Sequence, residues 1–187
     1  MDAALDWASV SALILIADLA ITSLHSYQEW KGEGAPLWRN FGAIVGLAVP
    51  DRWGFLFFTV GLTLALFIVG LIGILGPFGP SWTAGALAAL IGARLSDTLV
   101  SHVLLHTIGY RPNPGLRSTP LYVLEALFLV WAFQSSLAAD TRSAIIGLSV
   151  GALVFVLVLP VLRLLRWAKP AWKRPAWERW QPMPSSA

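Results

Sequence analysis

The sequence predicts an all-α membrane protein, a polytopic bundle of five transmembrane helices, from three observations. First, 57% of its 187 residues are hydrophobic and only 12% are charged, whereas about a quarter of the residues in soluble domains are charged. Second, the mean hydropathy is +0.69. Third, the apolar residues form five stretches, each close to the ~20 residues that an α-helix needs to cross a bilayer. One helical bundle with short connections accounts for this length.

The five predicted spans belong to one domain over residues 1–166. A Gly-Pro-Phe-Gly-Pro turn closes the second span and leaves little room for a loop. Pro160 is expected to kink or loosen the fifth span, because proline removes a backbone hydrogen bond. The spans cover about 8–26, 54–75, 82–107, 119–137 and 143–165.

Two further segments are expected at the membrane surface. Residues 28–53 combine glycine and proline breaks with an apolar face, which indicates either a short interfacial amphipathic helix or an ordinary packed loop. Residues 167–187 form a tail in which Trp, Lys or Arg, and Pro recur. Indole rings favour the membrane interface and basic side chains favour anionic lipid, so the tail is predicted to anchor at the surface, with partner binding as the alternative.

The basic residues predict the orientation of the bundle. Eleven of the thirteen Lys and Arg residues fall on one side of the predicted spans, Arg142 falls on the other, and Arg94 lies within a span. By the positive-inside rule the N-terminus is outside and the C-terminus is cytoplasmic. Because the basic residues lie at membrane ends, the net charge of +3 does not indicate nucleic-acid binding. The absence of cysteine excludes disulfides, thiolate metal sites and cysteine nucleophiles.

Asp18 and Arg94 are predicted to form a buried ion pair. At about 1.5 Å of rise per residue, they lie roughly 17 Å and 18 Å from the outer ends of their helices. A lone charge near the middle of a bilayer is costly, so the two should pair if their helices touch. This pair is expected to be structural.

All three histidines fall at the cytoplasmic ends of predicted spans. His25 and Glu29 share one face of the first helix, and His102 and His106 lie one turn apart on the third. Imidazole and carboxylate together suit Zn²⁺, Fe²⁺, Mn²⁺, Ni²⁺ or Cu²⁺, so His25, Glu29, His102 and His106 are the candidate ligands of a divalent transition metal. Glu125 could approach from the fourth helix.

The helical wheel separates Asp97 from this group. At 100° per residue, Asp97 and His106 point to opposite sides of one helix, so Asp97 is expected to lie with Arg94 in the deeper layer. The alternative for the histidines is that no metal binds and they bond to backbone or lipid. For Glu125 the alternative is a hydrogen bond to Tyr110, Tyr122 or a serine of the third helix.

These residues resemble two motifs of the HXXEE-motif family of bacterial membrane proteins. Members carry His-x-x-Glu-Glu at the end of the first helix, and His25 to Glu29 is similar except that Gln28 stands where the first glutamate is expected. His102-Val-Leu-Leu-His106, Tyr110, Pro114-Gly115 and Thr119 resemble the later block. The resemblance implies a multi-pass protein of the bacterial inner (plasma) membrane with a metal or proton-transfer site, and it names no reaction.

Three functions fit these features. The first is a metal-dependent membrane enzyme acting on a lipid-soluble or interfacial small molecule, with Glu29 and Glu125 as the catalytic acid or base. The second is a non-catalytic subunit of a membrane complex, docked through the tail. The third is a small proton, metal or solute carrier. A homo-oligomer is possible because Gly61-x-x-x-Ala65 and Gly85-x-x-x-Ala89 permit close helix contact.

Overall fold

The structure, a computed structural model, describes residues 7–31, 52–107 and 113–168. Within these ranges the chain is helical, as predicted. Of the proposed interfacial segment, residues 28–31 belong to α1 and residues 52–53 to α3, whereas residues 32–51 lie outside the described residues, as does the tail after Ala168. The helices are α1 (Trp7–Lys31), α3 (Arg52–Leu75), α4 (Pro80–Ser96), the π-helix η1 (Asp97–Leu104), α5 (Leu105–Thr107), the 3₁₀-helix η2 (Pro114–Arg117), α6 (Thr119–Ala132), α7 (Gln134–Ala139) and α8 (Thr141–Ala168).

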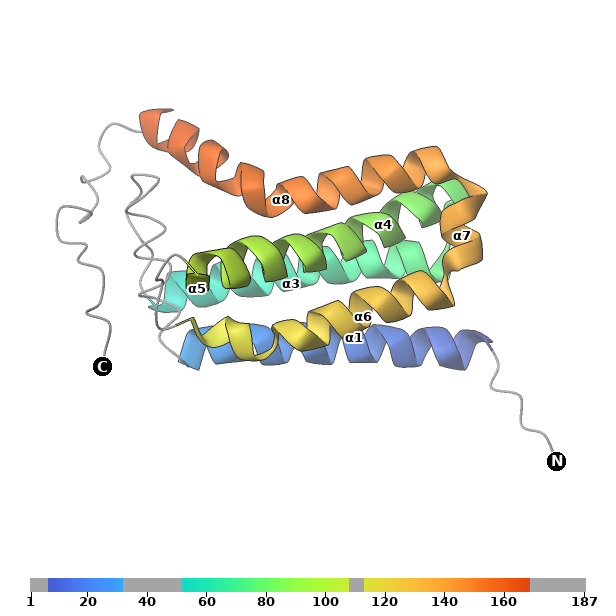
Figure 1. The fold of residues 1–187 in the computed structure, drawn as a ribbon, viewed down its shortest axis with the longest axis horizontal. Coiled ribbons are helices and arrows are strands. Elements are labelled where there is room, and N and C mark those ends of the chain that lie inside the picture. The colour runs from blue at the N-terminus through green and yellow to red at the C-terminus, as the bar shows by residue number, and fades with distance from the viewer. Residues whose placement is uncertain (1–6, 32–51, 108–112, 169–187) are drawn as a thin grey trace.

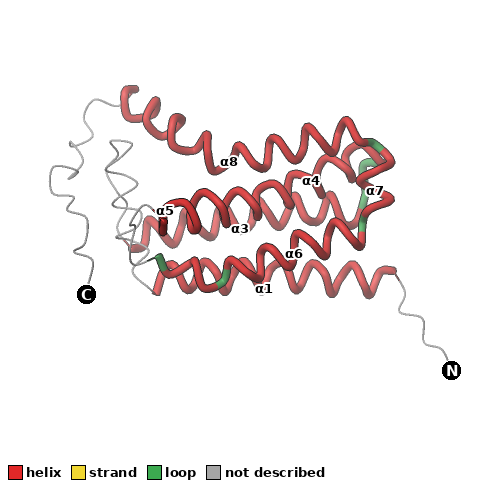
Figure 2. The backbone as a smooth tube through the Cα atoms, viewed as in Figure 1, coloured by secondary structure: helices red, strands yellow, loops and turns green. Residues whose placement is uncertain are grey.

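The helices lie side by side in a bundle with α4 at its centre. α4 contacts α3, α6, α7 and α8, whereas α1 contacts α3, α6 and η2 (Figures 1 and 2). The side chains of Leu87 and Leu90 on α4 are fully buried. The C-terminal end of α1, α5 and η2 lie at one end of the bundle, and α7 lies at the other end (Figure 1).

Two predicted spans differ from simple α-helices. The third continues without a break through α4, η1 and α5, but eight residues near its C-terminal end form a π-helix. The fourth is interrupted at Phe133, whose φ of −115° and ψ of 22° are not helical. The backbone N–H of Phe133 still bonds to the carbonyl of Leu129 at 3.0 Å, so the chain turns there without leaving that donor unpaired.

Small residues bring α4 and α8 into backbone contact. A Cβ atom at Gly147 would lie 2.0 Å from the carbonyl oxygen of Gly85, and one at Gly151 would lie 2.0 Å from that of Ala89. The Gly85-x-x-x-Ala89 pair, considered from the sequence as an oligomer contact, is therefore used by α8 of the same chain.

The N-terminus of α8 is capped by Asp140. The backbone N–H of Ser143 donates to its carboxylate at 3.0 Å, and the hydroxyls of Ser81 and Ser143 donate at 2.5 and 2.9 Å. The backbone N–H of Ser143 and these two hydroxyls hold the pKa of Asp140 below its usual range. Asp140 thus links the start of α4 to the start of α8.

The distribution of polarity is the reverse of that in most soluble proteins. Charged and polar side chains are buried, among them Asp18, Arg94, His102 and Glu125, at 0 to 8% exposure. Large apolar side chains are exposed on every long helix, including Ile16, Ile68, Leu124 and Ile145, at 55 to 64%. By length and composition, two described stretches, Ser9–Lys31 and Pro80–Leu104, could cross a membrane.

The contact between α4 and α8 gives a testable prediction. Replacing Gly151 by Ala should lower the free energy of unfolding by about 1–3 kcal/mol, because the new methyl group would overlap the Ala89 carbonyl and force the helices apart. Thermal unfolding in detergent measures this change. Gly61→Ala is the matched control, since nothing lies within 4 Å of a Cβ atom there. Equal unfolding temperatures for the two variants would contradict the packing described.

Candidate metal centre

One face of α1 carries the polar side chains that enter the bundle. Asp18, Thr22 and His25 are buried at 2 to 4% exposure, and the Glu29 side chain is 13% exposed. These positions recur at intervals of three and four residues, which is the spacing of one helical face. The face predicted from the sequence is therefore the buried one.

The π-helix η1 brings Asp97 and His102 together, and this corrects the expectation that Asp97 lies in the deeper layer. At 100° per residue, five positions would separate the two side chains by about 140° around an α-helix. In a π-helix the hydrogen bonds run from i to i+5, so residues five apart lie on similar sides. The His102 Nε2 atom is 3.8 Å from Asp97 Oδ1.

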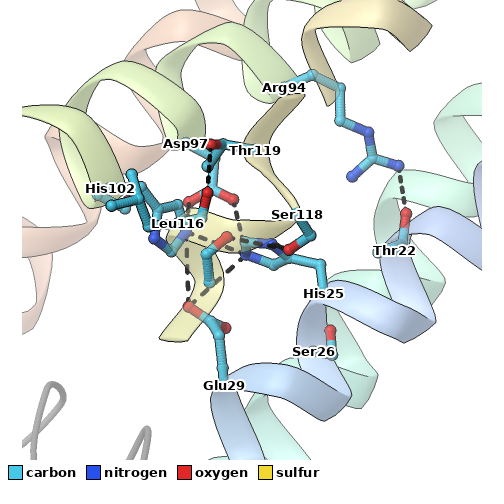
Figure 3. Close-up of polar contacts among 12 residues, drawn as sticks. Thr22, His25, Ser26, Glu29, Arg94, Asp97, His102, Leu116, Ser118 and Thr119 are labelled. Carbon is cyan, nitrogen blue, oxygen red and sulfur yellow. Dashed lines mark hydrogen bonds and ion pairs between the residues drawn. The ribbon is translucent and has the colours of Figure 1, made fainter. Parts of the chain in front are cut away.

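His25, Glu29, Asp97 and His102 form one buried group, called here the histidine cluster (Figure 3). The two Nε2 atoms of its histidines are 3.1 Å apart. Asp97 Oδ2 lies 3.3 Å from the Nε2 of His25. Glu29 Oε1 lies 3.7 Å from both Nε2 atoms. Two imidazoles and two carboxylates from α1 and η1 thus converge on one point.

Asn113 holds the ring of His102 through its Nδ1 atom. Its amide nitrogen donates to the backbone carbonyls of Ser101 and His102, at 3.3 and 3.1 Å, which identifies the other amide atom as the oxygen. That oxygen lies 2.7 Å from His102 Nδ1 and can only accept, so Nδ1 carries a hydrogen.

Ser118 fixes the ring of His25 in the same way. Its hydroxyl donates to the carbonyl of Gly115 at 3.0 Å and lies 2.8 Å from His25 Nδ1. With its hydrogen used on the carbonyl, the hydroxyl oxygen accepts from Nδ1. In both histidines the Nε2 atom is therefore the one left free to bind.

These hydrogen bonds leave a cluster that requires a cation. In neutral imidazoles protonated at Nδ1, both Nε2 atoms present lone pairs, and these face each other at 3.1 Å beside two carboxylates. Such groups repel one another unless protons or a metal ion lie between them. Among the described residues, His25, Asp97 and His102 satisfy the spacing for a metal ion, with all ligand atoms within 4.8 Å of one another.

The other predicted site residues lie differently. His106 is half-buried on α5 and does not belong to the metal-spaced group among the described residues. Glu125 does not reach the histidines directly: its Oε2 lies 3.2 Å from Arg94 Nε. Among the described residues its partner is thus neither Tyr122 nor a serine of the third helix; Tyr110, the other alternative considered from the sequence, lies outside the described residues.

Arg94 lies at the centre of a second buried group, the arginine cluster, which consists of Asp18, Thr22, Arg94, Tyr122 and Glu125. The predicted ion pair between Asp18 and Arg94 is present. The same Arg94 nitrogen donates to the hydroxyl of Thr22 at 2.5 Å, and that hydroxyl donates to the Asp18 carbonyl at 2.8 Å. The guanidinium lies 4.5 Å from the centre of the Tyr122 ring.

Tyr122 joins the two clusters. Its ring is in contact with the guanidinium of Arg94 and lies 4.7 Å, centre to centre, from the ring of His25. Its side chain is buried, at 2% exposure. α1 and the helix from α4 to η1 supply residues to both clusters, so the same two helices position both.

Asn113 and Ser118 are not predicted as site residues from the sequence, and Gly115 enters it only as part of the Pro114-Gly115 pair in the later motif block. All three follow His106, in the Pro-Asn-Pro-Gly turn, η2 and the residue before α6. The sequence signal for Asn113 and Ser118 is their nearness to the histidine motif, because side chains that hold a metal ligand carry no spacing rule of their own.

Comparison of the chain with protein-family models, curated proteins and solved structures finds no match. The resemblance to the HXXEE-motif family stays a prediction that rests on the two motifs.

The 3₁₀-helix η2 covers the histidine cluster closely and gives a second testable prediction. A Cβ atom at Gly115 would lie 2.1 Å from His102 Cε1 and 2.8 Å from both His102 Nε2 and His25 Cε1. Gly115→Ala should therefore displace both rings and weaken Zn²⁺ binding about 10- to 100-fold, as loss of a ligand's support does. Competition with a chromophoric chelator measures this affinity, and Gly61→Ala is the control. Unchanged affinity in Gly115→Ala would place the metal elsewhere.

Proposed function

We propose that the chain is a multi-pass protein of the bacterial plasma membrane that binds one divalent transition-metal ion and uses it to act on a lipid-soluble small molecule. The five helices α1, α3, α4 to α5, α6 to α7, and α8 are the proposed spans. Support comes from the apolar side chains exposed on each long helix and the charged ones buried between them. An apolar exterior of this extent is stable in a bilayer and costly in water.

The proposed orientation places the N-terminus outside and the histidine cluster near the cytoplasmic surface. It rests on the excess of Lys and Arg in the connections on that side. His25 and His102 lie at the same level of the bundle, since their Nε2 atoms are 3.1 Å apart, which supports a shared depth for these two histidines.

The observation that carries the metal proposal is the convergence of donor atoms. Two nitrogens each about 2.0–2.1 Å from a tetrahedral Zn²⁺ lie roughly 3.3 Å apart. The Nε2 atoms of His25 and His102 are 3.1 Å apart, and the nearest Asp97 oxygen is 3.3 Å from His25 Nε2. If protons alone balanced these groups, hydrogen bonds between separate pairs of side chains would be sufficient. A single metal ion explains why all the donor atoms point at one place.

The charge and type of the ligands define the ion. Two carboxylates and two neutral imidazoles carry a net charge of −2, which one divalent cation neutralises. Nitrogen and oxygen ligands without thiolate suit Zn²⁺, Fe²⁺ or Mn²⁺. Asp97 takes a ligand position that was predicted for His106.

Glu29 is the proposed link between the metal and a substrate. The Glu29 side chain is 13% exposed and that of Asp97 11%, whereas that of His102 is fully buried, so the cluster is more open on the side of its carboxylates. A bound ion would polarise a substrate oxygen or lower the pKa of a water molecule. Glu29 is then either the fourth ligand or a general base.

The departure from the HXXEE motif does not remove a residue of the histidine cluster. Gln28 replaces the first glutamate, but the residue that contacts both histidines is Glu29. If the chain belongs to that family, the retained glutamate is the one that the site uses, and one metal ion rather than two is expected.

Metal analysis of the detergent-purified protein tests this proposal. We expect close to one ion per chain in the wild type and its loss from His25→Ala, His102→Ala and Asp97→Asn, because each removes a ligand. His106→Ala is the matched control and should keep the ion. No metal in the wild type, even after dialysis against Zn²⁺, Fe²⁺ and Mn²⁺, would contradict the proposal.

Activity is tested separately. The metal-loaded wild type is incubated with a bacterial lipid extract, and the extract is compared by mass spectrometry with one treated with Asp97→Asn. A product made only by the wild type supports an enzyme. A metal-loaded protein that changes no component supports the alternative of a binding subunit.

A further inference from the structure

The arginine cluster holds more acid than base. Asp18 and Glu125 both contact Arg94, and each of these three side chains is at most 8% exposed. If both carboxyls were ionised, the cluster would carry a net charge of −1 in a low-dielectric interior. An unbalanced buried charge is costly, and a carboxyl in that position binds a proton instead.

The contacts show which carboxyl is already balanced. Asp18 is bonded directly to the guanidinium through Oδ1, and the same guanidinium nitrogen also donates to Thr22. Glu125 Oε2 lies 3.2 Å from Arg94 Nε, but the two are not aligned for a hydrogen bond. Asp18 is therefore the counter-ion of Arg94.

Glu125 lacks the donors that an ionised carboxylate needs. Both of its oxygens are buried and neither accepts a hydrogen bond within the described part of the chain. An ionised carboxylate offers about four acceptor positions, whereas a protonated one needs fewer partners. The environment of Glu125 thus favours the neutral acid.

The elements packed around Glu125 supply no second cation. α1 presents Asp18 and Thr22, α4 presents Arg94, and α6 itself presents Tyr122. Asp97 follows Arg94 by three residues, at the start of η1, and it pairs with His25 and His102. Among the described ion pairs, Arg94 is the only cation that Glu125 contacts.

We propose that Glu125 is a buried proton-binding site, holding a proton at neutral pH beside the Asp18–Arg94 ion pair. With this proton the arginine cluster is neutral. While Glu125 keeps its proton, it adds no charge to the apolar interior. This site stands independently of the metal, because it is formed by Asp18, Arg94 and Glu125 alone.

Infrared spectroscopy tests the proposal on the full chain in a detergent that lacks ester groups. At pH 7 the wild type should show the carbonyl stretching band of a protonated carboxylic acid, shifted in D₂O, and Glu125→Gln should lose it. Asp140→Asn is the control and should keep the band, because Asp140 lies between α7 and α8, away from the arginine cluster, and its pKa is lowered by the donors around it. The proposal is overturned if the wild type lacks this band, or if Glu125→Gln keeps all of it.

Asp18→Asn provides the sharper test, since it leaves Glu125 in place. Without Asp18, Arg94 needs a new counter-ion, so Glu125 should ionise and the band should disappear. Retention of the band in folded Asp18→Asn would overturn the charge-balance argument. If this variant does not fold, the wild type, Glu125→Gln and Asp140→Asn still decide the question. The spectra are recorded with and without added Zn²⁺, and the band is expected in both, so failure of the metal site would not affect the result.

Discussion

The interior of this bundle depends on the balance of buried charge, because an isolated charge in a low-dielectric environment is far more costly than one in water. The arginine cluster has one fixed cation and two carboxyls. The histidine cluster has two carboxylates and, with both imidazoles neutral, no fixed cation. Each cluster therefore needs a positive charge from solution, which our proposals supply as a proton on Glu125 and a metal ion between His25 and His102.

The fold provides the geometry for this balance. α4 lies at the centre of the bundle, and the π-helix that continues it turns Asp97 toward His102 and His25. Single π-helical turns are often found at functional sites, where they redirect a side chain within a continuous helix. The 3₁₀-helix η2 closes the cluster from another side, and only glycine at position 115 leaves room for both imidazole rings. The site thus depends on three local features, the π-helix η1, the 3₁₀-helix η2 and the glycine at position 115, rather than on one motif.

Much of this arrangement follows from the sequence. Hydropathy predicts the helices, and the spacing of Asp18, His25 and Glu29 predicts the buried face of α1. The depth of Asp18 and Arg94 predicts their contact, since rise per residue is constant in an α-helix. Asp97 could not be placed, because helical periodicity assumes 100° per residue and fails in a π-helix. Asn113 and Ser118 could not be found either, because they act through tertiary hydrogen bonds from a turn.

The central claim is that His25, His102 and Asp97 bind one ion beside Glu29, and metal-edge X-ray absorption of the loaded protein tests it most directly. The account predicts nitrogen and oxygen neighbours at about 2.0–2.2 Å, with the outer-atom scattering of two imidazole rings. It also predicts the same spectrum for His106→Ala. A first shell without imidazole, or three imidazoles that fall to two in His106→Ala, would contradict the site described.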